Sequence, residues 1–193
     1  MFFIRKPSAE RIREFIATQS PLPFSYEAVG ASQGDPPRGY VLDHNRVRLG
    51  SGRDLFQRAR EAVRRWEMFR LSWVQLCWPD TPIRVGAVVA VLGRACGLWS
   101  LNACRIVYLI EQVGSLEKFG FAYGTLPDHM ERGEERFSVE WHHADDSVWY
   151  DILAFSRPNK LVARMGYPIV RSLQKRFARE SKEAMCRAVC GCT

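Results

Sequence analysis

A carboxylate within an otherwise apolar strand face is the first feature of this sequence that points to chemistry. Glu135 alternates in phase with three apolar residues of the predicted strand Arg132–His142, namely Phe137, Val139 and Trp141. If this face is buried, Glu135 lies in an apolar environment, and burial raises the pKa of a carboxyl group. Glu135 is therefore a candidate catalytic acid or base. The alternative is an exposed or arginine-paired glutamate at the end of the strand.

The preceding predicted strand, Lys118–Leu126, carries an aromatic hydroxyl. Alternation places Tyr123 on the same face as Phe119, Phe121 and Thr125. One interpretation is a pocket wall, in which these three residues bind a ligand and Tyr123 acts as a catalytic acid. The other is a sheet face that packs on a helix. A free tyrosine has a pKa of about 10, so Tyr123 would need a charged neighbour to act as a base.

His129 and Glu131 are two residues apart, so they face the same way in an extended segment. A carboxylate can orient an imidazole and raise its basicity, which makes His129 a third catalytic candidate and Glu131 a ligand-binding one. The adjacent Pro127-Asp128 favours a loop equally well, with both side chains in solvent. A metal site would need a third ligand, and the sequence offers none beside this pair.

Four further residues are ligand-binding candidates from their positions alone. Tyr150 shares a strand face with apolar residues, where a core position with a bonded hydroxyl is the alternative. Arg157 follows the last predicted strand, where it could bind a carboxylate or phosphate or form a structural ion pair. Trp73 and His44 complete the set.

Known catalytic and metal-binding signatures are missing from the sequence. It contains no C-x-x-C, H-E-x-x-H or G-x-S-x-G motif, and its six cysteines are scattered. We therefore predict neither a metal nor a cofactor. The chain begins with no secretory signal and has no apolar stretch long enough to span a membrane, so we expect a cytoplasmic protein with reduced thiols.

Hydrophobic periodicity predicts the elements that position these residues. Helical spacing marks three segments: Ser8–Gln19, Arg53–Arg70 and Asn159–Val189, the last interrupted near Tyr167 by Pro168. Alternation marks seven strands: Tyr40–Leu49, Ser72–Trp78, Arg84–Leu92, Trp99–Glu111, Lys118–Leu126, Arg132–His142 and Ser147–Ser156. The last six are joined by short turns and are therefore antiparallel neighbours.

This element order predicts an α+β fold in which a curved, seven-stranded antiparallel sheet grips the long C-terminal helix. Residues 1–38 form an N-terminal helix and loop extension, and residues 39–193 form the helix-grip domain. A curled sheet of this kind commonly leaves a cavity between its concave face and the helix.

The sequence resembles a bacterial and plant family known as a domain of unknown function, number nineteen-ninety. The resemblance covers nearly the whole chain and is densest in the run FGFAYGTLPDHMERGEERF (119–137), in Phe155-Ser-Arg-Pro158 and in Gly166-Tyr-Pro168. The fold resembles the helix-grip fold of the START, Bet v 1 and polyketide-cyclase (SRPBCC) superfamily. That likeness implies small-molecule or lipid binding, with cyclisation or dehydration of the bound molecule in some members.

The net charge of +7 belongs to one segment. Residues 157–193 hold nine basic and two acidic residues, whereas the first 156 residues are neutral. A basic helix could bind nucleic acid or an anionic membrane, but its apolar stripe is needed to cover the sheet, so we expect neither partner.

The predicted function is binding of an apolar or aromatic small molecule, with or without cyclase- or dehydratase-like chemistry. The alternatives are the basic-helix binding module and a non-catalytic interaction protein, and the oligomeric state is not predicted.

Overall fold

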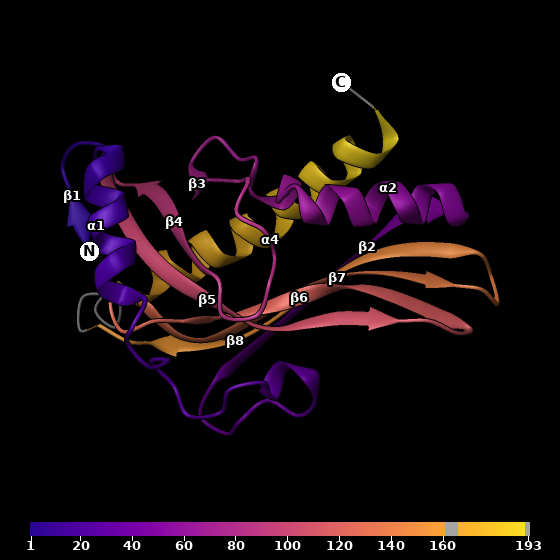
Figure 1. The fold of residues 1–193 in the computed structure, drawn as a ribbon, viewed down its shortest axis with the longest axis horizontal. Coiled ribbons are helices and arrows are strands. Elements are labelled where there is room, and N and C mark those ends of the chain that lie inside the picture. Colours follow the sequence, from indigo (N-terminus) through magenta and orange to yellow (C-terminus); the bar gives the residue numbers. More distant parts are fainter. Residues whose placement is uncertain (161–165, 192–193) are drawn as a thin grey trace.

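A computed structural model describes residues 1–160 and 166–191 of the chain. Its centre is a curled sheet whose main strands follow the order β2-β8-β7-β6-β5-β4-β3 (Figure 1). These strands are β2 (Val41–Ser51), β3 (Val74–Cys77), β4 (Val88–Ala95), β5 (Leu98–Gln112), β6 (Leu116–Thr125), β7 (Glu131–His142) and β8 (Ser147–Pro158). All neighbours are antiparallel, so the predicted seven-stranded helix-grip architecture is confirmed.

A short additional strand at the N-terminus was not predicted. β1 (Phe2–Phe3) pairs with the beginning of β5, where Phe2 lies opposite Ser100. It lengthens the sheet beyond the point where the pairing of β5 with β6 ends. Two residues are too few to show a periodic pattern, so hydrophobic periodicity could not predict this strand.

The first two helices form where the sequence predicts them, but the second is shorter. α1 (Ala9–Gln19) is capped by Ser8, whose Oγ accepts a hydrogen bond from the Arg11 amide at 3.2 Å. α2 (Arg53–Arg64) ends before Trp66, whose φ of 55° is incompatible with a right-handed helix. The 3₁₀ turn η2 (Glu67–Phe69) follows and keeps the apolar stripe against the sheet.

The C-terminal helix α4 (Tyr167–Cys190) begins at the predicted interruption. Pro168 lies in its first turn, where proline is tolerated because no intrahelical partner is needed for the missing amide hydrogen. The predicted helical start at Asn159 is wrong, since β8 extends to Pro158 and Asn159 and Lys160 are not helical. Residues 161–165 of that predicted helix lie outside the described residues.

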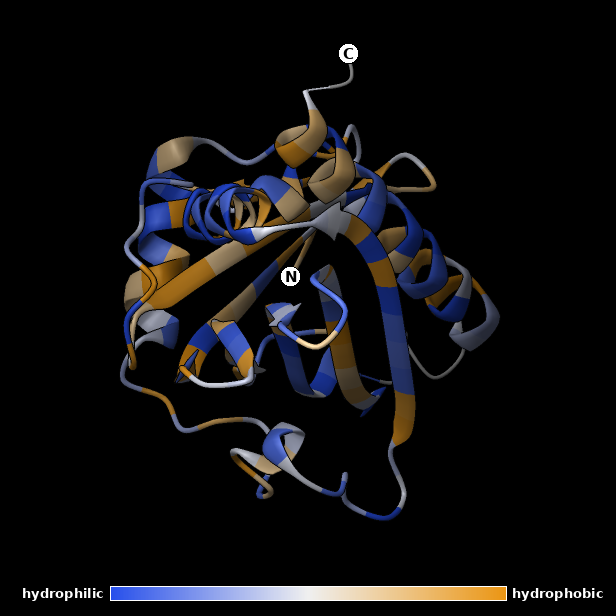
Figure 2. Cartoon of the chain, turned by 90° about the vertical axis from the view of Figure 1, so that its right-hand side faces the viewer, coloured by the Kyte–Doolittle hydropathy of each residue, from blue (hydrophilic) through white to orange (hydrophobic). Residues whose placement is uncertain are grey.

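The concave face of the sheet carries the main hydrophobic core. α2 and α4 lie together over this face (Figure 1). Phe56 and Trp66 from the α2 region, Phe121 and Phe137 from the sheet and Met185 from α4 are all fully buried there. In Figure 2 the helices carry both hydrophobic and hydrophilic bands, as expected of helices with one covered and one exposed side. The apolar stripe of α4 is therefore used by the core. No helix within the described ranges is long and apolar enough to span a membrane.

The N-terminal segment packs against the outer, convex face of the sheet. The buried carboxylate of Glu134 is one of the groups that hold this segment, since it accepts hydrogen bonds from the Tyr26 hydroxyl (2.7 Å), the Gly30 amide (2.7 Å) and the Ser32 amide (3.0 Å). Gly124 provides the space, because a Cβ at this position would lie 2.1 Å from the Tyr26 oxygen. The division at residues 38 and 39 into an extension and a domain remains a prediction.

Candidate functional site

A cavity of about 610 Å³ lies between the concave face of the sheet and α4. Most of its wall is apolar, with Phe69 from η2, Trp73 from the following loop, Ile152 from β8, and Leu173 and Phe177 from α4. Beneath the part of α4 that carries Leu173 and Phe177, the curl of the sheet separates the central strands from the helix and leaves the cavity. Beneath α2, large side chains fill the space between helix and sheet. Such a cavity is the kind that the predicted fold implies.

Two of the predicted catalytic residues form a hydrogen-bonded pair in the cavity wall. Tyr123 and Glu135 lie opposite each other in the β6–β7 register, and the Tyr123 hydroxyl donates to Glu135 Oε2 at 2.8 Å. Burial raises the pKa of Tyr123 well above its usual value, so this phenol stays protonated and acts as a donor.

Burial also raises the pKa of Glu135 to about 7, although the hydrogen bond from Tyr123 lowers it in part. The carboxyl group therefore exchanges a proton near neutral pH, which is the property required of a general acid or base. Glu135 is half-buried and lines the cavity, so a bound molecule can reach it.

Glu131 is a second cavity-lining carboxylate, and one of its oxygens is unsatisfied. Its side chain is almost fully buried, and Oε1 accepts no hydrogen bond from any described residue. Burial raises the pKa of Glu131 to about 7, while the nearby Ser156 hydroxyl and Arg171 guanidinium lower it in part. A buried, unpartnered carboxylate oxygen is costly, so a partner supplied from outside the protein would stabilise it.

His129 lines the same cavity but does not form the imidazole–carboxylate pair that its spacing suggested. Its Nδ1 lies 2.9 Å from the backbone nitrogen of Glu131, so the ring contacts the main chain of that residue instead of its carboxylate. Burial lowers the pKa of His129 to about 4, which keeps the imidazole neutral at physiological pH.

Two other predicted binding residues line the cavity, and both have polar partners in the protein. The Trp73 indole nitrogen donates to Glu180 at 2.7 Å, so its ring is held as part of the wall. Thr125 Oγ1 accepts a hydrogen bond from the Gly133 amide at 3.0 Å. That bond joins β6 to β7 close to Glu131.

Four predicted binding residues do not line the cavity. Phe121 is fully buried in the core, and Tyr150 is buried with its hydroxyl 3.0 Å from Ser181 Oγ. Phe119 lies beneath the arginines of α2, and the Arg157 guanidinium stacks over the Tyr40 ring at 4.6 Å. Phe121 and Tyr150 therefore match the alternative of core packing, whereas the stacking of Arg157 on Tyr40 is neither the ligand contact nor the ion pair considered from the sequence.

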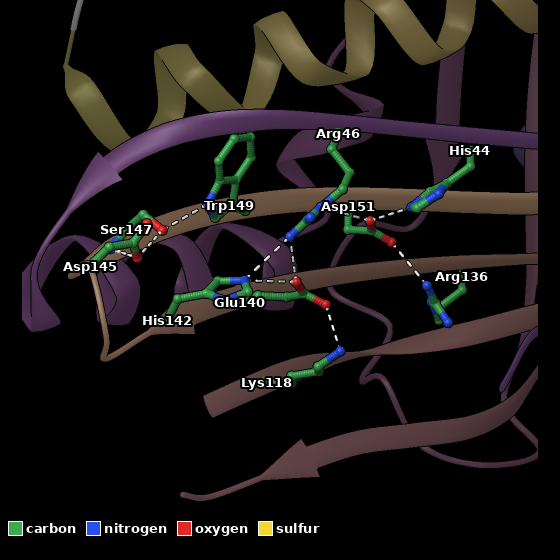
Figure 3. Close-up of polar contacts among 10 residues, drawn as sticks. All are labelled: His44, Arg46, Lys118, Arg136, Glu140, His142, Asp145, Ser147, Trp149 and Asp151. Atoms are coloured by element: carbon green, nitrogen blue, oxygen red, sulfur yellow. Dashed lines mark hydrogen bonds and ion pairs between the residues drawn. The ribbon is translucent and has the colours of Figure 1, made fainter. Parts of the chain in front are cut away.

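The imidazole of His44 lies on the outer face of the sheet, although its strand forms part of the cavity rim. Figure 3 shows it in a polar network that crosses the strands of this face. Its Nε2 lies 2.6 Å from Asp151 Oδ2, and Asp151 also accepts from Arg136 at 3.0 Å. Glu140 forms a second centre, 2.7 Å from Lys118 Nζ. Both buried carboxylates are paired, so the network stabilises the sheet and leaves no acceptor open.

Sequence reasoning missed several cavity residues. Phe69 and Phe177 belong to helical apolar stripes, which predict burial but cannot separate core from cavity wall. Asp43 lines the cavity and binds Arg171, with 2.7 Å between Oδ1 and Nη2. Asp43 lies four residues before Val47 on the same strand, so the two side chains face the same side, and this spacing was the available sequence signal that Asp43 faces inward. No three metal-binding side chains converge within the described part of the chain.

Comparison with known proteins places the chain among uncharacterised relatives. The sequence profile of a family described as a domain of unknown function (DUF1990) matches residues 25–184. A UPF0548 protein of Deinococcus radiodurans is 36% identical, with 100% of both chains covered. A UPF0548 protein of Dictyostelium discoideum is also 36% identical, covering 98% of this chain and 96% of the relative. The crystal structure of a hypothetical protein from Helicobacter pylori matches with a TM-score of 0.50 at 10% identity, covering 86% of this chain and 99% of the other, and this likeness concerns the fold alone.

Proposed function

The chain belongs to the DUF1990 family, and we propose that it binds an apolar or aromatic small molecule in the cavity between sheet and helix. The observation that carries the proposal is the cavity itself. Its volume of about 610 Å³ is within the range of small-molecule sites, and a few polar groups interrupt an apolar wall.

The composition of the wall indicates what such a molecule contacts. The rings of Phe69, Trp73 and Phe177 offer flat apolar surfaces to an aromatic or aliphatic body. The Tyr123–Glu135 pair gives one polar point of attachment in the sheet wall.

Acid–base catalysis on the bound molecule is a second candidate function, favoured by the Tyr123–Glu135 pair. In its ionised form Glu135 accepts a proton from the bound molecule, and in its protonated form it returns that proton to another atom. Tyr123 holds the carboxyl group in place through its hydrogen bond. Such a proton transfer needs no cofactor, and it is the acid–base step that cyclisations and dehydrations require.

Binding can be tested with diphenylhexatriene, a neutral hydrocarbon whose fluorescence rises in apolar surroundings. We expect saturable binding by the native protein and loss of binding in Leu173→Trp, which fills the cavity from α4. Ser172→Trp is the matched control, because Ser172 is exposed on the same helix and is not among the residues that line the cavity. Thermal unfolding checks that both variants fold. No binding by the native protein, or equal binding by the two folded variants, would overturn the proposal.

A further inference from the structure

We propose that the ligand carries a protonated amine and that Glu131 is its direct ionic partner. This inference rests on the proposed function, because it assigns a chemical class to the molecule that occupies the cavity. Its basis is the distribution of charge around the cavity: some of the carboxylates there are bound by groups of the protein, and others are not.

Glu131 provides the first observation. Only 8% of this residue is exposed, its Oε1 has no hydrogen-bond partner among the described residues, and it lines the cavity. Buried carboxylates in folded proteins are normally paired with a cation or bound by several donors. A donor that belongs to the ligand would complete this site.

Neighbouring carboxylates show what a completed site looks like in this protein. Asp43 binds the Arg171 guanidinium through both of its oxygens. Glu134, on the same strand as Glu131, is satisfied from the outer face by Tyr26 and the backbone of the N-terminal segment. Both groups are therefore used by the protein itself.

Glu135 is a second carboxylate of the wall, and the Arg171 guanidinium that lies near Glu131 is bound by Asp43. Among residues 1–160 and 166–191, no ion pair is formed by Glu131 or by Glu135. The cation in the cavity lining, Lys175, is exposed on α4. An anionic ligand would meet two like charges in an apolar wall, whereas an ammonium group would form charge-assisted hydrogen bonds.

The rest of the wall fits the body of such a molecule. Phe69, Trp73 and Phe177 supply apolar and aromatic surface, so the matching ligand has one cationic end and one apolar or aromatic end. Glu131 and Glu135 are four residues apart on β7, which separates their backbones by about 13 Å. One ammonium group therefore pairs directly with Glu131, and Glu135 adds to the negative potential of the wall.

The titratable and charged groups that surround the two carboxylates come from several elements. They are Asp43 on β2, Cys104 on β5, Tyr123 on β6, His129 in the β6–β7 turn, Tyr150 on β8, and Arg171 and Lys175 on α4. His44 and Glu134 also belong to the lining, but their side chains bind Asp151 and the N-terminal segment on the outer face. Tyr123, Tyr150 and Cys104 stay protonated because burial raises each pKa, and His129 stays neutral because burial lowers its pKa. Ionisation of the two glutamates therefore controls the charge of the wall between about pH 5 and pH 8.

The test uses three probes that share one ring system and differ in charge: naphthylethylamine, naphthylethanol and naphthylacetate. Their dissociation constants are measured by calorimetry at about pH 8 and about pH 5, where the amine remains protonated. We expect the amine to bind roughly ten- to hundredfold more tightly than the alcohol at pH 8, with the acetate weakest. The preference should decrease at pH 5, because both glutamates are then protonated.

Charge-neutral variants identify the partner. Glu131→Gln should abolish the preference for the amine over the alcohol, and Glu135→Gln should reduce it. Glu111→Gln removes the same charge from an exposed site on β5 and should leave the preference unchanged. Equal binding of the three probes, tighter binding of the acetate, or an unchanged preference in Glu131→Gln would overturn the inference. If diphenylhexatriene still binds in that case, the proposed function stands; if neither it nor any naphthyl probe binds, both fail.

Discussion

Replacing Glu131 by glutamine should change how the stability of this protein depends on pH. The side chain is buried, and its pKa is raised from 4.5 to about 7, mainly because burial disfavours the charged form. A carboxyl group whose pKa is higher in the folded state stabilises that state most when protonated. Its contribution is fully present below pH 4.5 and is lost as the pH rises through 7.

The size of the effect follows from the two pKa values. A change from 4.5 to about 7 corresponds to about 3 kcal/mol against the ionised form in the folded protein. The free energy of unfolding of the native protein should therefore fall by at most about 1.4 kcal/mol per pH unit between these values because of this group. Glutamine cannot ionise, so the stability of Glu131→Gln relative to the native protein should rise by about 3 kcal/mol between pH 4 and pH 9.

Urea unfolding, followed by tryptophan fluorescence at intervals across this pH range, measures the difference directly. Any constant cost of burying an amide in place of a carboxyl group shifts the whole curve and leaves its slope unchanged. Glu111→Gln, at an exposed position, should show a flat difference. A difference between Glu131→Gln and the native protein that does not change with pH would refute the assignment of Glu131 as a buried carboxylate with a raised pKa.

Three further substitutions test the surroundings of the cavity and the attachment of the N-terminal segment. Tyr123→Phe removes a hydrogen bond that lowers the pKa of Glu135, so this pKa should rise above about 7 in a carbon-13 NMR titration of the glutamate carboxyl groups; an unchanged value would contradict the pairing. Gly124→Ala should displace Tyr26 and lower the free energy of unfolding by about 1–3 kcal/mol in urea titrations, whereas native-like stability would show that the contact relaxes freely. Glu134→Gln replaces one acceptor oxygen by an NH2 donor, so the amide of either Gly30 or Ser32 should lose its partner at a cost of about 1–3 kcal/mol, and hydrogen exchange in residues 26–32 should become faster; native exchange rates would argue against this anchor.

The elements themselves are a local property of the sequence. The alternation that placed Tyr123 and Glu135 on inward faces depends only on the two-residue period of a strand, and the structure pairs them directly. Pro168 predicted an interruption near Tyr167 for a similarly local reason, since proline disrupts the interior of a helix but is tolerated in its first turn, and α4 begins at that point. The end of α2 was less visible, because Trp66 adopts a left-handed conformation that no residue type in the sequence announces.

Positions relative to the cavity depend on distant parts of the chain. Phe121 and Tyr123 share a strand and a face, and both are buried in the core, yet Tyr123 also lines the cavity. The Trp66 ring, with its centroid 4.7 Å from that of Phe121, covers Phe121 and separates it from the cavity. His44 shows the same limit, since its imidazole pairs with Asp151 on the outer face. The alternation along one strand predicts which face of the sheet a residue lies on, but it does not predict whether a helix covers that residue or leaves a cavity beside it.

The sequence by itself determined the seven main strands, the three helices apart from two of their ends, and the inward faces of β6 and β7, because periodicity and proline stereochemistry act over a few residues. Only the tertiary structure decided which carboxylates have partners. Asp43, Glu131 and Glu134 have the same charge, but Arg171 satisfies the first, the N-terminal segment satisfies the third, and the cavity leaves one oxygen of Glu131 open. The energy of a charge depends on the groups that the fold brings around it, and those groups come from remote parts of the chain.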